Sequence, residues 1–294
     1  MDPNTLLLGV DGGGTQCRAR LSTSSGAALG EGTAGPANIR YGLREALAAV
    51  IEAAGKCLEE ARLSSADLRR VIACLALAGA SEPTNRAAAQ KQGFPFARTI
   101  ITTDAQAACI GAHRGRDGGI IVVGTGTIGW AELAGRPYRV GGWGLPVSDE
   151  GSGAWLGCEV LRRALWAHDG RISWTELLRR AFAQFQCDPH AVVRWIAGAT
   201  PRDFGAFAPL VVEHAESGDP IALELMNLAG GHIDALAMRL IGLGAPRLAL
   251  AGGLGASIEP WLSPATRKYL VCPAGDALDG ALQLARAAAE AVAA

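Results

Sequence analysis

Two turns rich in glycine and threonine constrain the possible fold more than any other feature of this sequence. Each follows a short apolar run: residues 6–10 lead into 11–15, and residues 118–123 lead into 124–127. Glycine has no Cβ, so such turns expose backbone N–H groups at the end of a strand, where phosphate oxygens can approach. One such turn is common in ordinary hairpins. Two at matching points indicate a duplicated unit that binds a phosphate-bearing ligand.

The elements after the first turn define this unit. The alternation in residues 17–21 predicts a second strand of a hairpin, and residues 27–33 predict a third strand. Apolar residues at helical spacing then predict a helix over residues 43–62. The unit continues with a strand at 71–78, a helix near 84–92, a strand at 99–102 and a helix at about 105–113.

The second series repeats this order with an insertion. Its predicted elements are strands at 118–123, 128–133 and 138–140, a helical block at about 151–243 broken at Pro189, Pro201 and Pro220, strands at 248–251 and 269–272, and a helix at 277–291. We therefore expect an α/β protein with an N-terminal lobe, residues 1–115, and a C-terminal lobe, residues 116–294, that carries the insertion. Gly252 and Gly253 close one of these strands and form a third candidate ligand turn.

Composition excludes several classes of function. The 294 residues carry a net charge of −1 and only 19% charged residues, so no strong field attracts nucleic acid or an anionic membrane. The apolar runs are well under the roughly 20 residues of a membrane helix. Residues 1–4 lack the basic start of a signal peptide, so we expect a cytoplasmic protein. The seven cysteines form no CxxC pair, and we expect buried thiols instead of disulfides or a zinc site.

Other nucleotide-binding motifs fit poorly. The pair Gly55-Lys56 is followed by Cys57 and lacks the upstream glycine of a Walker sequence. Residues 124–129 match G-x-G-x-x-G, but residues 130–135 predict a strand entering a turn. A dinucleotide site needs a helix there to direct its dipole at the pyrophosphate, so the sequence disfavours that fold.

Three aspartates lie where a strand or loop gives way to another element. Asp104 and Asp149 each precede a predicted helix, so both could serve simply as helix N-caps. Asp11 closes a buried strand, which is costly for a carboxylate unless water or a cation accompanies it. Phosphoryl transfer needs a magnesium anchor and a base for the acceptor hydroxyl. These three acids could share such roles.

Five motifs together resemble one enzyme family. Residues 10–15, 103–105, 124–127, 141–144 and 148–152 are similar, in order and spacing, to the N-acetylglucosamine kinases and the bacterial glucosamine kinases. These kinases are related to the BadF/BadG/BcrA/BcrD-type ATPases within the sugar kinase, Hsp70 and actin superfamily. The resemblance extends from the first strand to residues 276–281, which is nearly the whole chain.

The resemblance implies two ribonuclease-H-like (actin-like ATPase) lobes, with ATP and sugar meeting in a central cleft. It further implies that Asp11 holds Mg²⁺ through water and that Asp104 is the general base for the sugar 6-hydroxyl. The residues implied to contact ATP are Gly12, Gly13, Gly14, Thr15, Thr125, Gly126 and Gly253. Those implied to contact the sugar are Asn38, Asp104, Gly142, Trp143, Gly144 and Asp149.

Some of these residues have simpler interpretations without the resemblance. Trp143 alone would be a core aromatic and Asn38 a turn residue. Thr127 stands where the family often has serine, so its contact with ligand stays open. The cysteines match no zinc cluster of the kind found in repressor-like glucokinases, which argues against that branch.

Two other functions compete with the kinase. One is an ATPase that activates a CoA-ester dehydratase or reductase, but the cysteines form no convincing ligand set for its iron–sulfur cluster. The other is a catalytically silent sugar-sensing regulator, against which Asp104 and the lack of a DNA-binding extension before Leu6 argue. We expect an ATP- and Mg²⁺-dependent kinase for N-acetylglucosamine or glucosamine, acting as a homodimer without nucleic-acid or membrane partners.

Overall fold

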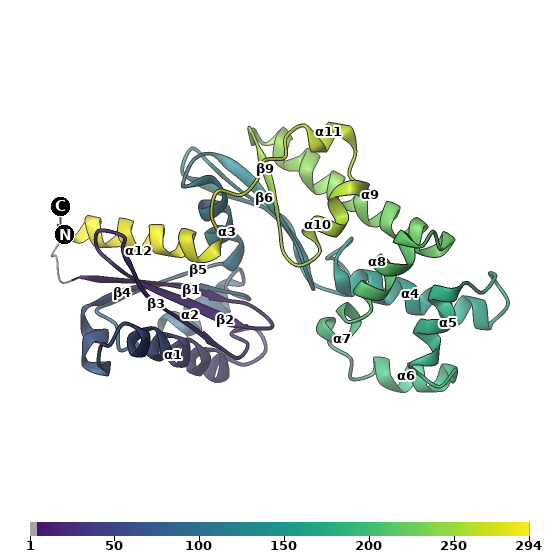
Figure 1. Ribbon diagram of the computed structural model, residues 1–294, viewed down its shortest axis with the longest axis horizontal. Coiled ribbons are helices and arrows are strands. Elements are labelled where there is room, and N and C mark those ends of the chain that lie inside the picture. The colour runs from purple at the N-terminus through teal and green to yellow at the C-terminus, as the bar shows by residue number, and fades with distance from the viewer. Residues whose placement is uncertain (1–4, 294) are drawn as a thin grey trace. The chain divides into compact units, whose positions relative to one another are not determined.

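The computed structural model describes residues 5–293 and divides them into two compact units (Figure 1). The first comprises residues up to 118, with 132–137 and 272 onward; the second comprises 119–131 and 138–271. The sequence predicts the C-terminal segment in the second lobe, whereas the contacts of the residues from 272 onward group them with the first unit. Residues 1–4, on which the signal-peptide expectation rests, lie outside the described residues.

The first unit is built on a mixed sheet of five strands in the order β3-β2-β1-β4-β5. The strands are β1 (Leu6–Gly12), β2 (Cys17–Thr23), β3 (Ala28–Ala34), β4 (Val71–Leu77) and β5 (Arg98–Thr102). The first three pair antiparallel, whereas β4 and β5 continue parallel to β1. The α/β fold class and this strand arrangement confirm the expectation from the sequence.

Helices cover both faces of this sheet. They are α1 (Leu43–Glu60), α2 (Pro83–Gln90), α3 (Asp104–His113) and α12 (Ala277–Ala293), with a 3₁₀ turn η1 (Ser65–Arg70) before β4. Figure 1 shows α1 on one face and α12 on the other. Side chains alternate along a strand, so neighbouring residues of β1 point to opposite faces of the sheet. Leu8 packs in the core between the sheet and α1, and Leu7 packs in the core between the sheet and α12.

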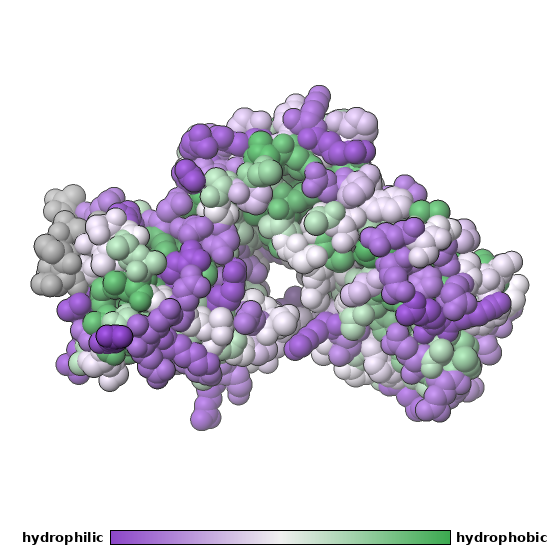
Figure 2. Space-filling model, viewed as in Figure 1, coloured by the Kyte–Doolittle hydropathy of each residue, from purple (hydrophilic) through white to green (hydrophobic). Residues whose placement is uncertain are grey.

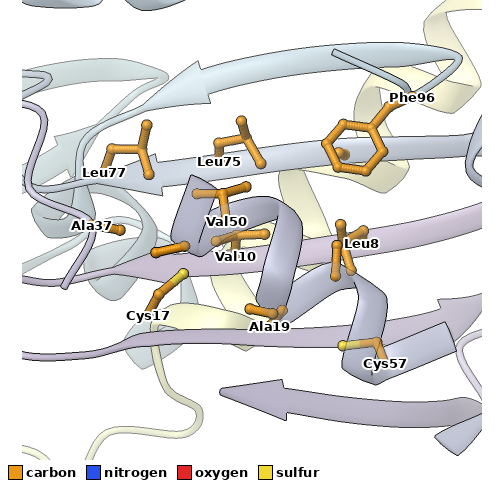
Figure 3. Close-up of a cluster of buried hydrophobic side chains, with 14 of the residues drawn as sticks. Leu8, Val10, Cys17, Ala19, Ala37, Val50, Cys57, Leu75, Leu77 and Phe96 are labelled. Carbon is orange, nitrogen blue, oxygen red and sulfur yellow. The ribbon is translucent and has the colours of Figure 1, made fainter. Parts of the chain in front are cut away.

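The core under α1 contains small and branched side chains with almost no exposed area (Figure 3). Val50 of α1 and Leu75 of β4 are fully buried, and each such side chain stabilises the fold by about 1.5–3 kcal/mol relative to exposure. Cysteines serve here as small apolar residues, as expected: Cys17, Cys57, Cys74 and Cys109 are buried. Burial raises the pKa of the Cys74 thiol to about 12. The expectation is wrong for Cys187 and Cys272, which are exposed.

The second sheet has the order β8-β7-β6-β9. Its strands are β6 (Gly118–Val123), β7 (Thr127–Leu133), β8 (Arg136–Gly141) and β9 (Leu248–Ala251). The strand predicted at residues 269–272 is wrong: Leu270 makes only an isolated bridge with Leu248. The chain then reaches Pro273, which has no N–H to continue a ladder.

The predicted helical block is confirmed as a succession of helices. They are α4 (Gly153–His168), α5 (Glu176–Ala183), α6 (Pro189–Ile196), α7 (Pro201–Gly205), α8 (Ala208–Glu216) and α9 (Pro220–Gly242). Shorter turns follow β9: α10 (Gly255–Ile258), η2 (Glu259–Trp261) and α11 (Pro264–Arg267). The three prolines expected as breaks are each the first residue of a helix, where proline's missing N–H costs nothing.

Hydrophilic side chains cover much of the visible surface of each unit, with apolar residues in smaller patches (Figure 2). Within residues 5–293, none of the helices combines the length and the hydropathy that crossing a bilayer would require.

Candidate functional site

The parallel strands of the first unit bring two of the predicted acids to one edge of the sheet. Asp11 of β1 is level with Ala76 of β4, which is level with Thr102 of β5. Strands lie about 4.8 Å apart, so the backbones of Asp11 and Thr102 are separated by about 10 Å. Asp104 follows two residues after Thr102. The carboxyl ends of parallel strands are where α/β proteins place ligands, and both acids lie there.

The first glycine turn is fixed at its base and open at its tip. Gly13 N donates to Gln16 O at 3.0 Å, and Ala37 N donates to Gly13 O at 3.0 Å. Gly14 and Thr15 at the tip are exposed. Their backbone N–H groups and the Thr15 hydroxyl are the kind of donors that phosphate oxygens accept from.

Asn38 lies beside this turn. Its Oδ1 accepts from Arg40 N at 2.9 Å, the local turn that its residue type predicts. The segment is held at the same sheet edge because Ile39 N donates to Ala78 O at 3.0 Å, just after β4. The turn-residue interpretation is therefore correct, and it also brings the Asn38 side chain to the edge that carries Asp11.

Asp104 is not the helix cap that its position alone suggested. The N-cap of α3 is Thr103, whose hydroxyl oxygen accepts from Gln106 N at 3.0 Å. Asp104 is the first residue of the helix; its Oδ1 accepts from Ala105 N at 2.9 Å, and its side chain is half-buried. A carboxylate at this position is stabilised by the positive end of the helix dipole.

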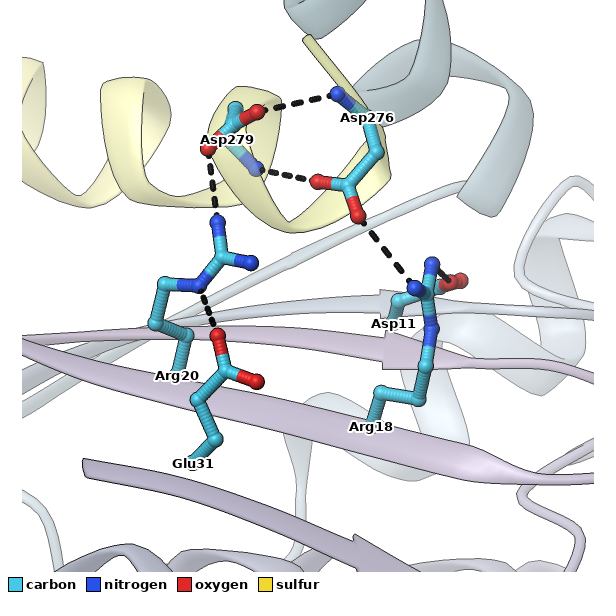
Figure 4. A network of polar contacts seen from close by, with 6 residues as sticks. All are labelled: Asp11, Arg18, Arg20, Glu31, Asp276 and Asp279. Atoms are coloured by element: carbon cyan, nitrogen blue, oxygen red, sulfur yellow. Dashed lines mark hydrogen bonds and ion pairs between the residues drawn. The ribbon is translucent and has the colours of Figure 1, made fainter.

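Arg18 is a residue of this edge that the sequence analysis missed. It is the cross-strand partner of Asp11, and its Nη2 lies 2.7 Å from Asp11 Oδ2, while its Nη1 lies 3.2 Å from Asp276 Oδ2 (Figure 4). Burial lowers the pKa of the Arg18 guanidinium, but the two carboxylates outweigh burial and the net pKa is raised. The signal was available, because the predicted hairpin already set residues 11 and 18 opposite each other.

The second glycine turn lies against the start of α4. Gly153 N donates to Gly124 O at 2.8 Å and Ala154 N to Thr125 O at 3.1 Å, while the Thr125 side chain is exposed. The turn after β9 is adjacent, since Leu254 N donates to Val123 O at 2.9 Å. Gly253 in that turn is exposed, and a Cβ there would meet no atom within 4 Å.

Asp149 joins two predicted ligand turns of the second unit. Its Oδ1 accepts from Gly144 N at 3.0 Å, and a Cβ on Gly126 would lie 2.5 Å from its Oδ2. Its backbone φ is +68°, a left-handed conformation that few residues with side chains adopt. The N-cap of α4 is Ser152, so the capping interpretation of Asp149 is wrong as well.

Trp143 is two-thirds exposed, so it is not a core aromatic. The Arg139 guanidinium lies 3.9 Å from the centre of its ring, a cation–π contact that holds the indole in place. Arg139 also donates to the carbonyls of Gly141 and Gly142. An exposed indole fixed in this way offers a flat apolar face to a ligand. Gly142 itself has a left-handed φ of +71°.

Thr127 has a different environment from the other residues of the second turn. It is 2% exposed, and its Oγ1 has no hydrogen-bond partner among the described residues. A buried hydroxyl without a partner costs about 1–3 kcal/mol. Thr127 is therefore buried, whereas Thr125 of the same turn is exposed.

The donor chemistry at Asp11 fits magnesium carried by a nucleotide. No three His, Cys, Asp or Glu side chains within the described part of the chain gather as a metal cluster. Mg²⁺ bound with ATP needs only one or two carboxylates, because phosphate oxygens and water complete its shell. Asp11, with one-fifth of its side chain exposed beside an open glycine turn, offers one such carboxylate.

Known proteins resemble this chain over nearly its full length. Glucosamine kinase GspK of Vibrio cholerae is 40% identical over 278 residues, which are 95% of each chain. An N-acetylmuramic acid/N-acetylglucosamine kinase of Clostridium acetobutylicum is 27% identical over 76% of this chain and 75% of its own. A solved structure from Chromobacterium violaceum, of a candidate N-acetylglucosamine kinase, superimposes with a TM-score of 0.91 at 36% identity, covering 96% of this chain and all of that one.

The family-level comparison agrees with the motifs and with the fold. Residues 8–268 match the sequence pattern of the BadF/BadG/BcrA/BcrD ATPases, so the match includes both glycine turns and all three aspartates. This protein is therefore a member of the BadF/BadG/BcrA/BcrD ATPase family.

Proposed function

We propose that this protein transfers the γ-phosphoryl group of ATP to the 6-hydroxyl of an amino sugar, either glucosamine or N-acetylglucosamine. The observation that carries the proposal is the pair Asp11 and Asp104 at one sheet edge, beside an open glycine turn. One carboxylate can serve a metal and the other a hydroxyl, which are the two acidic roles that phosphoryl transfer needs. Relatives named as amino-sugar kinases support the choice of acceptor.

The nucleotide is assigned to the glycine turns. Gly12, Gly13, Gly14, Thr15, Thr125 and Gly126 would receive the ATP phosphates, and Gly253 would lie beside the adenosine. Asp11 would hold Mg²⁺ through water. When bound, the metal neutralises charge on the β- and γ-phosphates. The open tip at Thr15 and the exposed side chain of Thr125 support these roles.

The sugar is assigned to Asp104 and to residues of the turns described above. Asp104 would accept the proton of the 6-hydroxyl while that oxygen bonds to the γ-phosphorus, and the bond from that phosphorus to the ADP oxygen breaks. Asn38, Gly142, Trp143, Gly144 and Asp149 would contact the sugar. The exposed, arginine-backed indole of Trp143 supports this, because aromatic faces pack against the C–H faces of sugars.

The test is ADP formation with Mg²⁺ and four acceptors: glucosamine, N-acetylglucosamine, glucose and N-acetylmannosamine. We expect one of the first two to raise ATP turnover well above the sugar-free rate and above the rate with the other two. The ratio of the turnover rates with glucosamine and with N-acetylglucosamine also decides which amino sugar is preferred. Equal turnover with and without every sugar would contradict the proposal.

The relatives do not favour either alternative, the activator ATPase or the silent regulator. A sugar-independent ATPase rate in the same assay would favour the activator ATPase. The homodimer, the cytoplasmic location and the absence of a nucleic-acid partner stay predictions from the sequence.

A further inference from the structure

Two arginines on β2 each bridge a pair of carboxylates, in the same arrangement two residues apart (Figure 4). Arg18 lies between Asp11 and Asp276, at 2.7 and 3.2 Å. Arg20 lies between Glu31 and Asp279, at 2.6 and 2.8 Å. Only the Arg18 bridge includes a residue to which the proposed function gives a role.

The strand register produces these two bridges. Asp11 is opposite Arg18 in the β1–β2 pair, and Arg20 is opposite Glu31 in the β2–β3 pair. Residues 18 and 20 share one face of β2 because side chains alternate, and that face is the one covered by α12. The start of α12 therefore supplies the second carboxylate of each bridge.

The start of α12 is fixed independently of the arginines. Asp276 N donates to Asp279 Oδ2 at 3.0 Å, and Asp279 N donates to Asp276 Oδ1 at 3.1 Å, a reciprocal cap. Glycines then hold α12 close to its neighbours: a Cβ on Gly111 of α3 would overlap Asp276 O, and one on Gly280 would overlap Ala107 O. The position of the Asp276 carboxylate is thus fixed by the helix start, and its Oδ2 faces Arg18.

Arg18 and a divalent cation would compete for the same carboxylate. The guanidinium keeps its charge at every physiological pH, so it cannot release Asp11 by losing a proton. A second carboxylate on the other nitrogen of the guanidinium repels the first, and it leaves Arg18 with an anionic partner when the first turns away.

We propose that Asp276 is a positioning residue of the nucleotide site: it retains Arg18, so that the Asp11 carboxylate can turn to Mg²⁺. The inference rests on the proposed function, which assigns the metal to Asp11. It gives Asp276, which lies just before α12 and at the other end of the sequence from Asp11, an indirect role in metal binding through Arg18.

The test measures the affinity of a non-hydrolysable ATP analogue by titration calorimetry, with Mg²⁺ and with EDTA. The Kd with EDTA divided by the Kd with Mg²⁺ reports how much the metal contributes to binding. Asp276→Asn keeps the oxygen that caps Asp279 N and removes the charge that faces Arg18. We expect the ratio to fall about two- to fivefold, the scale of a partly exposed ion pair.

Asp279→Asn is the matched control. It removes one charge from the same helix start and the same cap, and it releases Arg20 instead of Arg18. We expect its ratio to equal that of the wild type. The Asp276→Asn effect should also vanish in an Arg18→Met background, because no guanidinium is left to hold Asp11.

The outcomes separate the inference from the proposed function. If the wild type binds the analogue equally with Mg²⁺ and with EDTA, and Asp11→Asn changes nothing, the metal role of Asp11 fails and the inference falls with it. If the wild-type ratio is large and Asp11→Asn lowers it, but Asp276→Asn matches Asp279→Asn, the inference alone is overturned.

Discussion

The carboxylate of Asp219 links two helices of the second unit, α5 and α9. Its Oδ1 accepts from Ile221 N at 3.0 Å and Ala222 N at 3.2 Å, which caps α9, and its Oδ2 accepts from Leu177 N at 3.0 Å in α5. Burial raises the pKa of Asp219, but the hydrogen bonds from these backbone groups and from the Thr175 side chain outweigh it, so the net pKa lies below its ordinary 3.8. The charged form is therefore the one that stabilises the fold.

A lowered pKa predicts a stability contribution that is present above about pH 4 and is lost as the pH falls through the folded-state pKa. We expect Asp219→Ala to lower the free energy of unfolding by about 1–2 kcal/mol at pH 7, the cost of a lost N-cap. The loss should shrink as the pH falls below about 4 and should disappear only once the folded wild type is itself protonated. Urea unfolding of both proteins at pH 7 and pH 3 measures this, and a loss of equal size at both pH values would contradict it.

Residue types were predictable at the site, but conformations were not. Asp149 was identified from its motif, yet its left-handed backbone and its bond to Gly144 N depend on a turn of several glycines that no local pattern fixes. Trp143 alone suggested a core aromatic, because hydropathy says nothing of an arginine stacked on the ring. Such features are set by tertiary contacts, so the sequence could name these residues without placing them.

Two neighbouring glycines of α9 provide a matched test of packing. A Cβ on Gly230 would overlap the backbone carbonyl of Trp261, whereas a Cβ on Gly231 would meet no atom within 4 Å. We expect Gly230→Ala to destabilise the protein by about 1–3 kcal/mol through overpacking. Gly231→Ala should stabilise it by about 0.5–1 kcal/mol, because alanine favours a helix interior. Thermal unfolding compares the two, and shifts of the same sign would contradict this packing.

The elements themselves followed largely from periodicity and from turn residues. The strands of the first unit and the long helices have strong patterns, and they form as predicted. The strand expected at 269–272 was predicted from its apolar residues alone. It does not form, because the pairing stops after one bridge and Pro273 has no N–H to extend it. The sequence of the alanine-rich α12 does not indicate which strand the helix packs against. It packs on β1 because Gly9 leaves room, where a Cβ would lie 2.8 Å from Leu278 O.

For the whole molecule, the order of motifs identified the family, and the sheet topology explains why those motifs matter. Parallel pairing of β1, β4 and β5 brings Asp11 and Asp104 to one edge although 93 positions separate them in the chain. The Arg18 bridge to Asp276 was not predictable, because it joins residues from opposite ends of the sequence. Long-range contacts of this kind need the fold before they can be seen.

The central claim is that Asp104 acts as a base and not as a structural cap, and two adjacent substitutions separate these roles. Asp104→Asn keeps an oxygen for Ala105 N but cannot accept a proton, so we expect kcat to fall by about 10²–10⁴ with little change in Tm. Thr103→Ala removes the true N-cap of α3, so we expect it to cost about 1 kcal/mol of stability and to leave kcat near wild type.

The decisive measurement is therefore kcat and Tm for these two variants, with the amino sugar that the acceptor panel prefers. The account predicts opposite profiles: Asp104→Asn folded and inactive, Thr103→Ala less stable and active. An Asp104→Asn variant that melts early yet retains near-native kcat would contradict it and leave the base to be sought at another carboxylate.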